Sequence, residues 1–260
     1  MPADAAPTIL TDLTDGVFTL RFNRPDKKNA ITSAMYTAMA DAIATAGATR
    51  EARCLFITGS PEVFCAGNDL QDFLADQKTD ESNPTLRFMR ALAEFEKPVV
   101  AAINGPAIGI GSTLLLHCDL VYAGETARFQ FPFVNLGICP EFGSTELMPR
   151  MMGHAKAAEL LLLAEPFTAA KACEVGLINA VLPNAEVEAH ARSKAGKFAA
   201  MPPNALRVSK RLMKRGSSAG MLELILLEAS HFVPMLKQPE ALEAIQAFLG
   251  KRKPDFSQFA

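Results

Sequence analysis

The stretch Ile103-Asn-Gly-Pro-Ala-Ile-Gly-Ile-Gly-Ser112 closes an apolar run, residues 98–103, and continues through three glycines. A second stretch, Phe64-Cys-Ala-Gly-Asn-Asp-Leu70, follows the apolar run 55–58 in the same way. Glycine adopts backbone angles that other residues avoid, and it lets a ligand approach the main chain closely. Each stretch therefore predicts a tight turn after a buried strand, with backbone N–H groups open to a ligand.

Two such turns together are typical of an oxyanion hole, a pair of N–H donors that holds a developing negative charge. We expect residues 112–118 to form a helix, which would put the N–H groups near Ile110 and Gly111 at its positive end. A preorganised donor of this kind is worth roughly 100- to 1000-fold in rate. The alternative is that both stretches are ordinary strand-to-helix turns.

Several other segments complete a pattern that one enzyme family shares. They are Asn23-Arg-Pro-Asp-Lys-Lys-Asn-Ala30, Lys97-Pro-Val-Val-Ala-Ala-Ile-Asn-Gly105, Cys118-Asp-Leu-Val-Tyr-Ala123 and residues 131–143. With the two turns, they resemble the crotonase family, which is also called the enoyl-CoA hydratase/isomerase family. The resemblance implies that the N–H groups of Ala66 and Ile110 grip the thioester oxygen of a coenzyme A ester.

Periodicity along the chain predicts an α/β protein. Residues 17–22 alternate in hydrophobicity and predict a strand with Phe18, Leu20 and Phe22 on one face. A helix over 34–46, capped by Thr32 or Ser33, precedes a unit of strand, turn and helix that recurs. Further strands are expected at 55–58, 98–103 and 120–123, and further helices at 155–164, 169–175, 186–199, 203–214, 221–232 and 239–249.

The resemblance organises these elements into a crotonase-type spiral of β-β-α units with a C-terminal helical region. Residues 1–200 are expected to form the spiral core with the coenzyme A and acyl site. Residues 201–260 are expected to serve oligomerisation and to cover the active site, in a homotrimer or a dimer of trimers. Because 221–227 is apolar nearly all round, its own core or a neighbouring subunit should cover it. The polar stretch 71–96 is expected to be mobile and to cover the acyl pocket.

Composition limits the classes of function. The chain has 260 residues, 49% of them hydrophobic and 21% charged, which suits a globular protein with a substantial core. Its net charge of −2 gives no basic field for nucleic acid. Five cysteines without a Cys-x-x-Cys pair argue against disulfides and zinc. No secretory or peroxisomal signal is visible. We expect a cytoplasmic protein with no membrane or nucleic-acid partner.

Glu141 is the candidate acid and base. It lies in Leu136-Gly-Ile-Cys-Pro-Glu-Phe-Gly-Ser144, between a proline and a phenylalanine on a glycine-bounded loop. An apolar pocket there would raise its pKa toward neutrality, so that it could both accept and return a proton. The alternative is that Glu141 caps a helix that starts near Ser144. The neighbouring Glu146 is expected to be a surface or helix-start charge.

The resemblance also bears on the reaction. Hydratases of the family use two glutamates to activate water, and the matching positions here are Thr113 and Phe133. Phe133 is expected to line the acyl tunnel instead. The Δ3,Δ2-enoyl-CoA isomerases of the family carry their catalytic glutamate in a loop like that of Glu141. The resemblance therefore implies an isomerase that converts 3-enoyl-CoA to 2-enoyl-CoA. The alternatives are a hydratase or other crotonase-type lyase, and a non-catalytic acyl-CoA-binding or RNA-associated scaffold.

Other residues are expected to bind the substrate. Gly67, Asn68 and Leu70 would shape the pantetheine and acyl path, and Asp69 would either bond loop backbone or take part directly. Lys27 and Lys28 are candidates for the adenine and phosphate end of coenzyme A, although a solvated basic pair is as common.

The C-terminal tail gives weaker signals. By the resemblance, Lys251 and Lys253, with Phe248, match a tail that often reaches a coenzyme A. His117-Cys118-Asp119 invites a metal site or a nucleophile, but consecutive side chains point in different directions, which favours a buried helix end. No metal and no cofactor are expected, since coenzyme A is part of the substrate.

Overall fold

Two β-sheets organise the chain in the computed structural model, which describes residues 6–70, 72, 82–218 and 220–259. The main sheet has the order β1 (Ile9–Thr14), β2 (Val17–Phe22), β3 (Cys54–Thr58), β4 (Val99–Ile103), β6 (Leu120–Gly124) and β9 (Ala180–Leu182). The second sheet has the order β5 (Pro106–Ile108), β7 (Arg128–Gln130) and β8 (Phe167–Thr168). The α/β class predicted from the sequence is confirmed.

Successive strands pass from one sheet to the other. β4 in the main sheet leads to β5 in the second, β6 leads to β7, and β8 returns to β9. Neighbouring strands of the main sheet run parallel, except that β1 is antiparallel to β2. This alternation builds the spiral that was expected. It also brings the turn after β3 against β5, because Cys65 forms a parallel bridge with Ala107.

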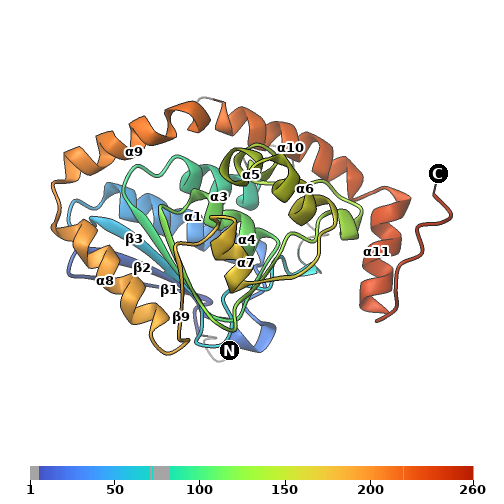
Figure 1. Ribbon diagram of the computed structural model, residues 1–260, viewed down its shortest axis with the longest axis horizontal. Helices are drawn as coiled ribbons and strands as arrows, with labels where there is room; N and C mark the ends of the chain where they lie inside the picture. The colour runs from blue at the N-terminus through green and yellow to red at the C-terminus, as the bar shows by residue number, and fades with distance from the viewer. Residues whose placement is uncertain (1–5, 71, 73–81, 219, 260) are drawn as a thin grey trace, which may run out of the picture.

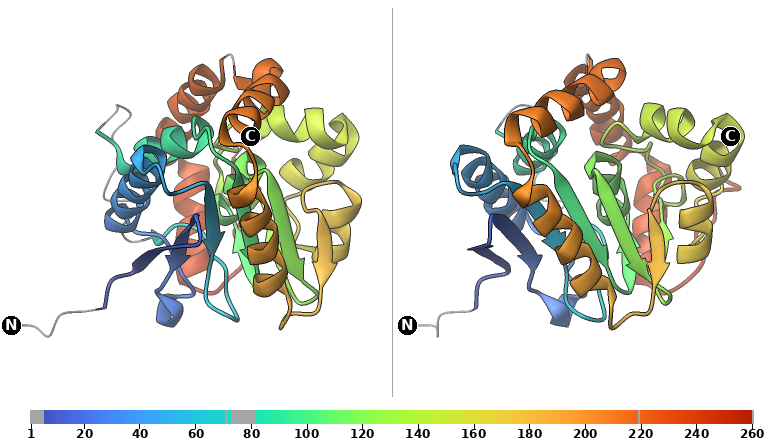
Figure 2. Two further views of the ribbon diagram at one scale, coloured as in Figure 1. Left: turned by 90° about the vertical axis from the view of Figure 1, so that its left-hand side faces the viewer. Right: turned by 60° about the vertical axis from the view of Figure 1, so that its left-hand side comes forward.

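Helices cover both faces of the main sheet (Figure 2). α1 (Ser33–Ala48) and α3 (Pro84–Ala93) share the main core with Phe18, Leu20 and Phe22 of β2. α8 (Val187–Ala200) packs on the opposite face, where Val17 joins a second, smaller core. Both faces of β2 are therefore buried, whereas the sequence predicted only one. The reason is that parallel strands of this kind have a helix on each side.

The first helix begins and ends close to its predicted bounds. Thr32 caps it, since its side-chain oxygen accepts a hydrogen bond from the Met35 N–H at 3.3 Å. Of the two capping candidates, Thr32 is thus the residue used. Met35, Met39 and Ile43 are buried at four-residue spacing against the core, as an amphipathic helix requires.

Three elements differ from the sequence prediction. β1 was not predicted, because its exposed edge is polar; Asp15 and Gly16, both with positive φ, form its hairpin turn with β2. Part of the stretch expected to be mobile, 84–93, is α3, whose Phe88, Met89 and Leu92 are buried. Residues 71 and 73–81 of that stretch lie outside the described residues. The helix expected at 112–118 is only α4 (Ile110–Thr113), followed by a 3₁₀ turn.

The later helices occur where they were predicted, with ends shifted by a few residues. They are α5 (Ser144–Met152), α6 (His154–Leu162), α7 (Ala169–Glu174), α8, α9 (Pro203–Ser218), α10 (Met221–Met235) and α11 (Pro239–Leu249). α9 and α10 form an arch over the sheet, and α11 stands to one side (Figure 1). In the described ranges, no helix is long and apolar enough to cross a membrane.

α10 is covered on one side only within the chain. Met221, Ile225 and Phe232 join the main core. Leu226 and Leu227 are 42% and 56% exposed. The apolar start of this helix is therefore not fully covered by its own core.

Candidate active site

The two glycine-containing turns lie against one another. The Cys65 N–H donates to the Pro106 carbonyl at 2.9 Å, and the Ile108 N–H donates to the Cys65 carbonyl at 2.9 Å. Side chains would keep them apart, since a Cβ on Gly111 would lie 2.8 Å from the Cys65 oxygen and one on Gly67 3.1 Å from the Ile108 oxygen. Glycine at 67 and 111 is what lets two backbones come together here.

The N–H of Ala66 is already occupied. It donates to the Lys28 carbonyl at 3.0 Å, which joins the turn to the segment that holds the two lysines. The prediction that the Ala66 N–H serves as an oxyanion donor does not fit this geometry. Residue letters do not reveal the direction of a backbone amide, so the sequence could not have excluded this.

The N–H of Asn68 is the better placed donor on the first turn. Ile31 lies opposite: its N–H donates to the Gly67 carbonyl at 2.8 Å, and its carbonyl accepts from the Asp69 N–H at 2.9 Å. Because these flanking groups face Ile31, the Asn68 N–H faces away from it. Neither Asn68 nor Ile110 uses its N–H in a hydrogen bond to any described residue. Each of these two amides therefore keeps a donor that no described residue uses.

Tyr36 connects the first turn to the acid. Its hydroxyl donates to Asn68 Oδ1 at 2.5 Å, from α1. Burial, followed by the charge of Glu141, raises the pKa of Tyr36 well above its usual value. The same charge effect means that Glu141 lies near this tyrosine. Sequence reasoning missed Tyr36, because it reads as one more residue of the core-facing stripe of α1.

Glu141 has the environment of an acid–base group. It is 5% exposed, and its Oε1 has no hydrogen-bond partner among the described residues. Burial, and then the nearby carboxylate of Glu228, raise its pKa from 4.5 to about 8. The alternative role as a helix cap is wrong for the side chain, because Glu228 is the carboxylate that binds the first N–H groups at the start of α5.

The loop that carries Glu141 is fixed at the next residue. Phe142 has a φ of 60°, a left-handed conformation that costs a non-glycine residue about 1–2 kcal/mol. Its carbonyl lies 2.8 Å from His117 Nε2, and the two rings stack with centroids 4.0 Å apart. Burial lowers the pKa of His117 to about 3, so the imidazole is neutral and Nε2–H is the donor. His117 thus holds the loop in place.

The positions that match hydratase glutamates carry no acid. Thr113 is fully buried on α4, and its Oγ1 has no partner among the described residues. Phe133 is 4% exposed and packs edge-on against Phe232, with ring centroids 6.4 Å apart. Neither side chain can exchange a proton with a substrate carbon.

The other predicted residues are placed around the first turn. Lys27 and Lys28 are exposed at the 3₁₀ turn Pro25–Lys27. Asp69 pairs with Arg24 at 2.8 Å, which is a structural contact between the same two segments. Leu70 is half-buried at the end of this turn. At the far end of the chain, Lys251, Lys253 and Phe248 are all exposed.

Asn29 was missed by the sequence analysis. It is fully buried with a φ of 54°, and its amide nitrogen donates to the carbonyls of Val63 and Phe64 at 2.9 and 3.1 Å. It ties the lysine segment to the first turn. The sequence signal for Asn29 was its residue type, because asparagine adopts the left-handed conformation more readily than most residues.

The residues His117-Cys118-Asp119 do diverge, as expected. His117 points to the Phe142 loop, and burial raises the pKa of the Cys118 thiol to about 12. Asp119 accepts from the Val99 N–H and from Lys210 Nζ, each at 2.7 Å. Over the described part of the chain, no three His, Cys, Asp or Glu side chains gather to hold a metal ion.

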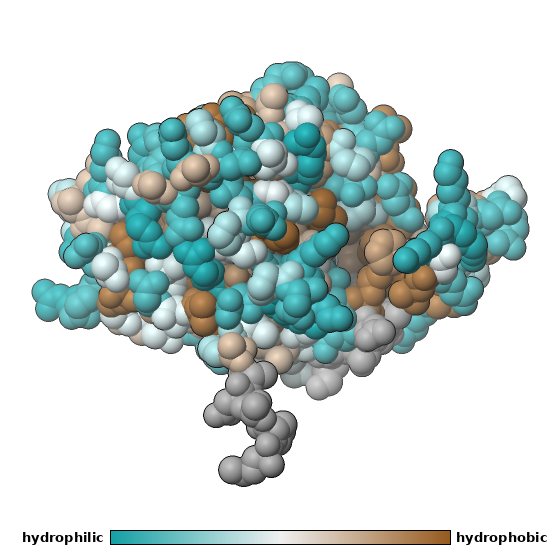
Figure 3. Space-filling model, turned by 90° about the horizontal axis from the view of Figure 1, so that it is seen from below, coloured by the Kyte–Doolittle hydropathy of each residue, from teal (hydrophilic) through white to brown (hydrophobic). Residues whose placement is uncertain are grey.

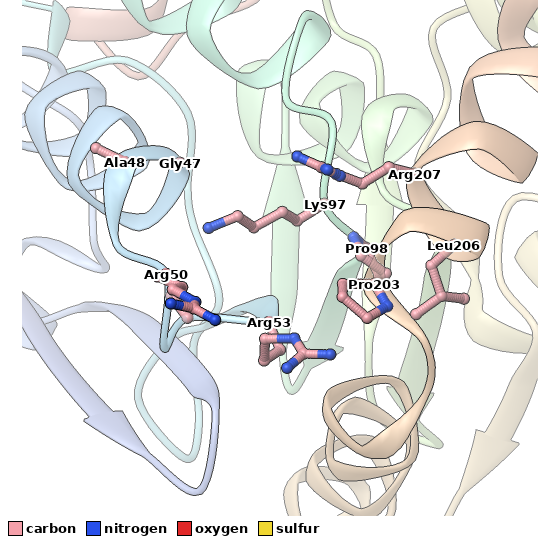
Figure 4. A pocket seen from close by; sticks show the side chains of 10 residues that line it. Gly47, Ala48, Arg50, Arg53, Lys97, Pro98, Pro203, Leu206 and Arg207 are labelled. Carbon is pink, nitrogen blue, oxygen red and sulfur yellow. The ribbon is translucent and has the colours of Figure 1, made fainter.

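A separate cavity of about 430 Å³ lies at the other end of the strands. Figure 4 shows Arg50, Arg53, Lys97 and Arg207 around it. It opens where β3 and β4 begin, whereas the two turns follow the ends of these strands. Lys97 Nζ already donates to the carbonyls of Ala46 and Thr49 at the end of α1, at 2.6 and 2.7 Å. This cavity is not part of the Glu141 site.

Fold and site together define a class: an α/β spiral that combines a buried carboxyl, Glu141, with two glycine-containing backbone turns. The sequence profile described as enoyl-CoA hydratase/isomerase matches residues 12–259. The chain therefore belongs to the enoyl-CoA hydratase/isomerase family.

The relatives of this chain include proteins named as isomerases and proteins named as hydratases. The chain is 35% identical to Enoyl-CoA delta isomerase 2 of Rattus norvegicus over 97% of its own length, and it spans 66% of that relative. It is 34% identical to 2,3-dehydroadipyl-CoA hydratase of Escherichia coli strain K12, over 92% of this chain and 94% of that protein. The structure of OdaA from Pseudomonas aeruginosa matches with a TM-score of 0.91 at 49% identity, over 94% of this chain and 99% of that one.

Proposed function

We propose that this protein is an acyl-CoA isomerase that converts 3-enoyl-CoA to 2-enoyl-CoA. The observation that carries the proposal is Glu141, a buried carboxyl whose Oε1 has no described partner and whose pKa is raised to about 8. A group with a pKa near the working pH can both take a proton and give it back. An isomerase needs one group that does both.

The reaction begins at the thioester. Its oxygen lies between the N–H groups of Ile110 and Asn68, the second of which replaces Ala66 as the donor on the first turn. Glu141 takes a proton from C2, and the electron pair left on C2 moves into the thioester carbonyl and the 3,4 double bond as a dienolate. The two amides hold the negative oxygen. Glu141 then returns the proton to C4, which leaves the double bond between C2 and C3.

The residues around Glu141 support isomerisation over hydration. Thr113 and Phe133 offer no second carboxylate to hold and activate a water. Buried Phe142 and Phe88, with ring centroids 5.9 Å apart, make the surroundings of the Glu141 loop apolar, which disfavours proton exchange between the dienolate and water and addition of water to the 2-enoyl product. The relatives at similar identity include a hydratase, so hydration is the competing outcome.

The test follows products from two substrates. The purified protein is given 3-enoyl-CoA and, separately, 2-enoyl-CoA, and the products are identified by mass spectrometry and by the absorbance of the conjugated thioester. We expect the first to be isomerised and the reaction to be lost in Glu141→Gln. The matched control is Glu146→Gln, which changes an exposed carboxylate paired with Arg150. Prompt hydration of 2-enoyl-CoA that survives in Glu141→Gln would overturn the proposal.

Substrate binding and assembly follow from the same proposal. Lys27 and Lys28 would bind the phosphate end of coenzyme A, and Gly67, Asp69 and Leu70 would border its path. Residues 201–260 would cover the site and form a homotrimer or a dimer of trimers. Figure 3 shows an apolar area on this face of the molecule, and Leu242, Phe248 and Leu249 of α11 are exposed. Light scattering would measure the number of subunits in the assembly. The cytoplasmic location stays a prediction.

A further inference from the structure

A second buried carboxyl lies beside the Glu141 loop and comes from the C-terminal region. Glu228 on α10 is 6% exposed. Its Oε2 accepts from the Gly143 N–H at 2.6 Å, and its Oε1 accepts from the N–H and the hydroxyl of Thr145 at 3.2 and 2.5 Å. All three donors stand at the beginning of α5, two to four residues after Glu141. α10 is therefore fastened to the loop that carries the proposed acid.

The two carboxyls have opposite surroundings. Burial raises the pKa of Glu228 above its usual value, but the three hydrogen bonds that this carboxyl accepts oppose the rise and stabilise its charged form. Glu141 is equally buried, but its Oε1 accepts none from the described residues. When two neighbouring carboxyls share one proton, the carboxyl that accepts more hydrogen bonds is the one that ionises. The charge therefore belongs on Glu228 and the proton on Glu141.

We infer that Glu228 is a positioning residue for the Glu141 site: it holds the loop against α10 and, as the charged member of the pair, keeps the proton on Glu141. This inference rests on the proposed function for its effect on turnover. The predicted effect of Glu228 on the ionisation of Glu141 is independent of the proposed function, because it depends only on the fold.

The other titratable groups around the pair leave Glu228 as the main charge that acts on Glu141. Tyr36, facing from α1, and Cys139, on the loop itself, both have raised pKa values and are neutral near pH 7; that of Cys139 is about 11. His117, from the 3₁₀ turn, is neutral because its pKa is about 3. The charge of Glu146 on α5 also raises the pKa of Glu228, but Glu146 is partly exposed and paired with Arg150 at 2.9 Å.

The experiment compares Glu228→Gln with Glu223→Gln in the full-length protein. Glu223 lies on the same helix but is exposed, so the second variant removes the same charge away from the loop. Carboxyl groups of glutamate are labelled with ¹³C and titrated by NMR, with the Glu141 signal assigned by its loss in Glu141→Gln. The pH dependence of kcat/KM with 3-enoyl-CoA is measured in parallel.

We expect Glu228→Gln to lower the midpoint of the Glu141 titration by about one pH unit, because a like charge has been removed. The acidic limb of kcat/KM should move in the same direction, with KM changed less than kcat, while Glu223→Gln leaves both unchanged. A purely structural role for Glu228 would lower the melting temperature and leave the midpoint where it was. That result would overturn the inference.

The titration of the wild-type protein and the separate outcomes for the two proposals complete the test. If Glu228→Gln does not fold, the titration of the wild-type protein still tests the inference. Glu141 should titrate near pH 8, at a pH where Glu228 is already ionised. If Glu228 instead titrates at a higher pH than Glu141, the inference is overturned. The two proposals also fail separately. A shifted midpoint in a protein that does not turn over 3-enoyl-CoA refutes the isomerase alone, and an active isomerase with an unmoved midpoint refutes the role of Glu228 alone.

Discussion

Asp119 and Glu141 are two carboxyls with opposite bonding: the Asp119 side chain is partly buried, at 24% exposure, whereas Glu141 is 5% exposed. Asp119 is bonded by the Val99 N–H and by Lys210, so its charge fastens α9 to the start of β4. Glu141 has a carboxyl oxygen with no described partner. Leaving a buried polar group unpaired costs roughly 1–3 kcal/mol. A paired, partly buried charge thus stabilises the fold, whereas a buried carboxyl oxygen without a described partner is a candidate to meet a substrate.

The variant Glu141→Gln tests this contrast between the two carboxyls most directly. We expect it to lower kcat/KM for 3-enoyl-CoA by roughly 100- to 10,000-fold, the usual contribution of a general acid or base. The free energy of unfolding at neutral pH should not fall, since the variant removes an unpaired group rather than a bond. Steady-state kinetics and urea titration measure the two quantities. A large loss of stability would show that Glu141 is a structural residue like Asp119.

The second effect is on pH dependence, and activity and stability should respond in opposite directions. With a pKa of about 8, Glu141 becomes a base only as the pH rises, so kcat/KM should increase by about 100-fold from pH 6 to pH 9. Activity that is flat over this range would contradict the raised pKa.

The stability side of the same titration has a definite sign. The folded pKa of Glu141 lies above its usual 4.5, so the folded protein holds a proton that the unfolded chain has released. This contribution is complete below about pH 4.5 and is lost at about 1.4 kcal/mol per pH unit as the pH rises toward 8. Glu141→Gln should abolish the loss, and urea titrations of both proteins at pH 5, 7 and 9 would reveal it.

Asp119→Asn should produce the converse phenotype. Removal of the charge that binds Lys210 is expected to lower the free energy of unfolding by about 2 kcal/mol, while kcat/KM of the folded protein changes less than threefold. Asp41→Asn is the matched control, because Asp41 pairs with Arg87 on the exposed surface, where ion pairs contribute about 0–1 kcal/mol. An equal effect of the two variants in urea titration would mean that the lower exposure of the Asp119–Lys210 pair does not matter.

The smallest expected effect concerns Tyr36. Tyr36→Phe removes the hydrogen bond to Asn68 Oδ1 beside the proposed donor amide, and we expect kcat/KM to fall by about fivefold, which corresponds to roughly 1 kcal/mol. Tyr122→Phe changes the other tyrosine of the chain, which packs against His190 on the far face of the sheet. Equal rates for the two variants would remove Tyr36 from the site.

Much of the fold was visible in the sequence because apolar runs and glycine turns are local signals. β3, β4 and β6, and the stripe Met35, Met39 and Ile43, follow from periodicity alone. β1 was missed because an edge strand with one exposed face carries little hydrophobic pattern, although Asp15-Gly16 is a hairpin signal. α3 was missed for the opposite reason: its three buried residues follow a polar stretch that dominated the prediction.

The site was only partly predictable. Glu141 could be identified because its loop has a composition that suggests a dry pocket. The choice between Ala66 and Asn68 depends on which way a backbone N–H points, and that is set by Lys28 and Ile31 across the turn. Glu228 could be found only when α10 was folded back, 85 residues later in the chain, onto the N–H of Gly143.

The left-handed Phe142 also has a consequence for how such a protein comes into being. Its conformation is unfavourable in isolation, and the ring contacts that hold it come from His117 and from Phe88, at centroid distances of 4.0 and 5.9 Å. A newly made chain cannot hold this loop by itself, because the groups that compensate the cost are delivered by other parts of the molecule. The Glu141 loop can therefore reach its final conformation only after α3 and the segment that carries His117 have folded around Phe142.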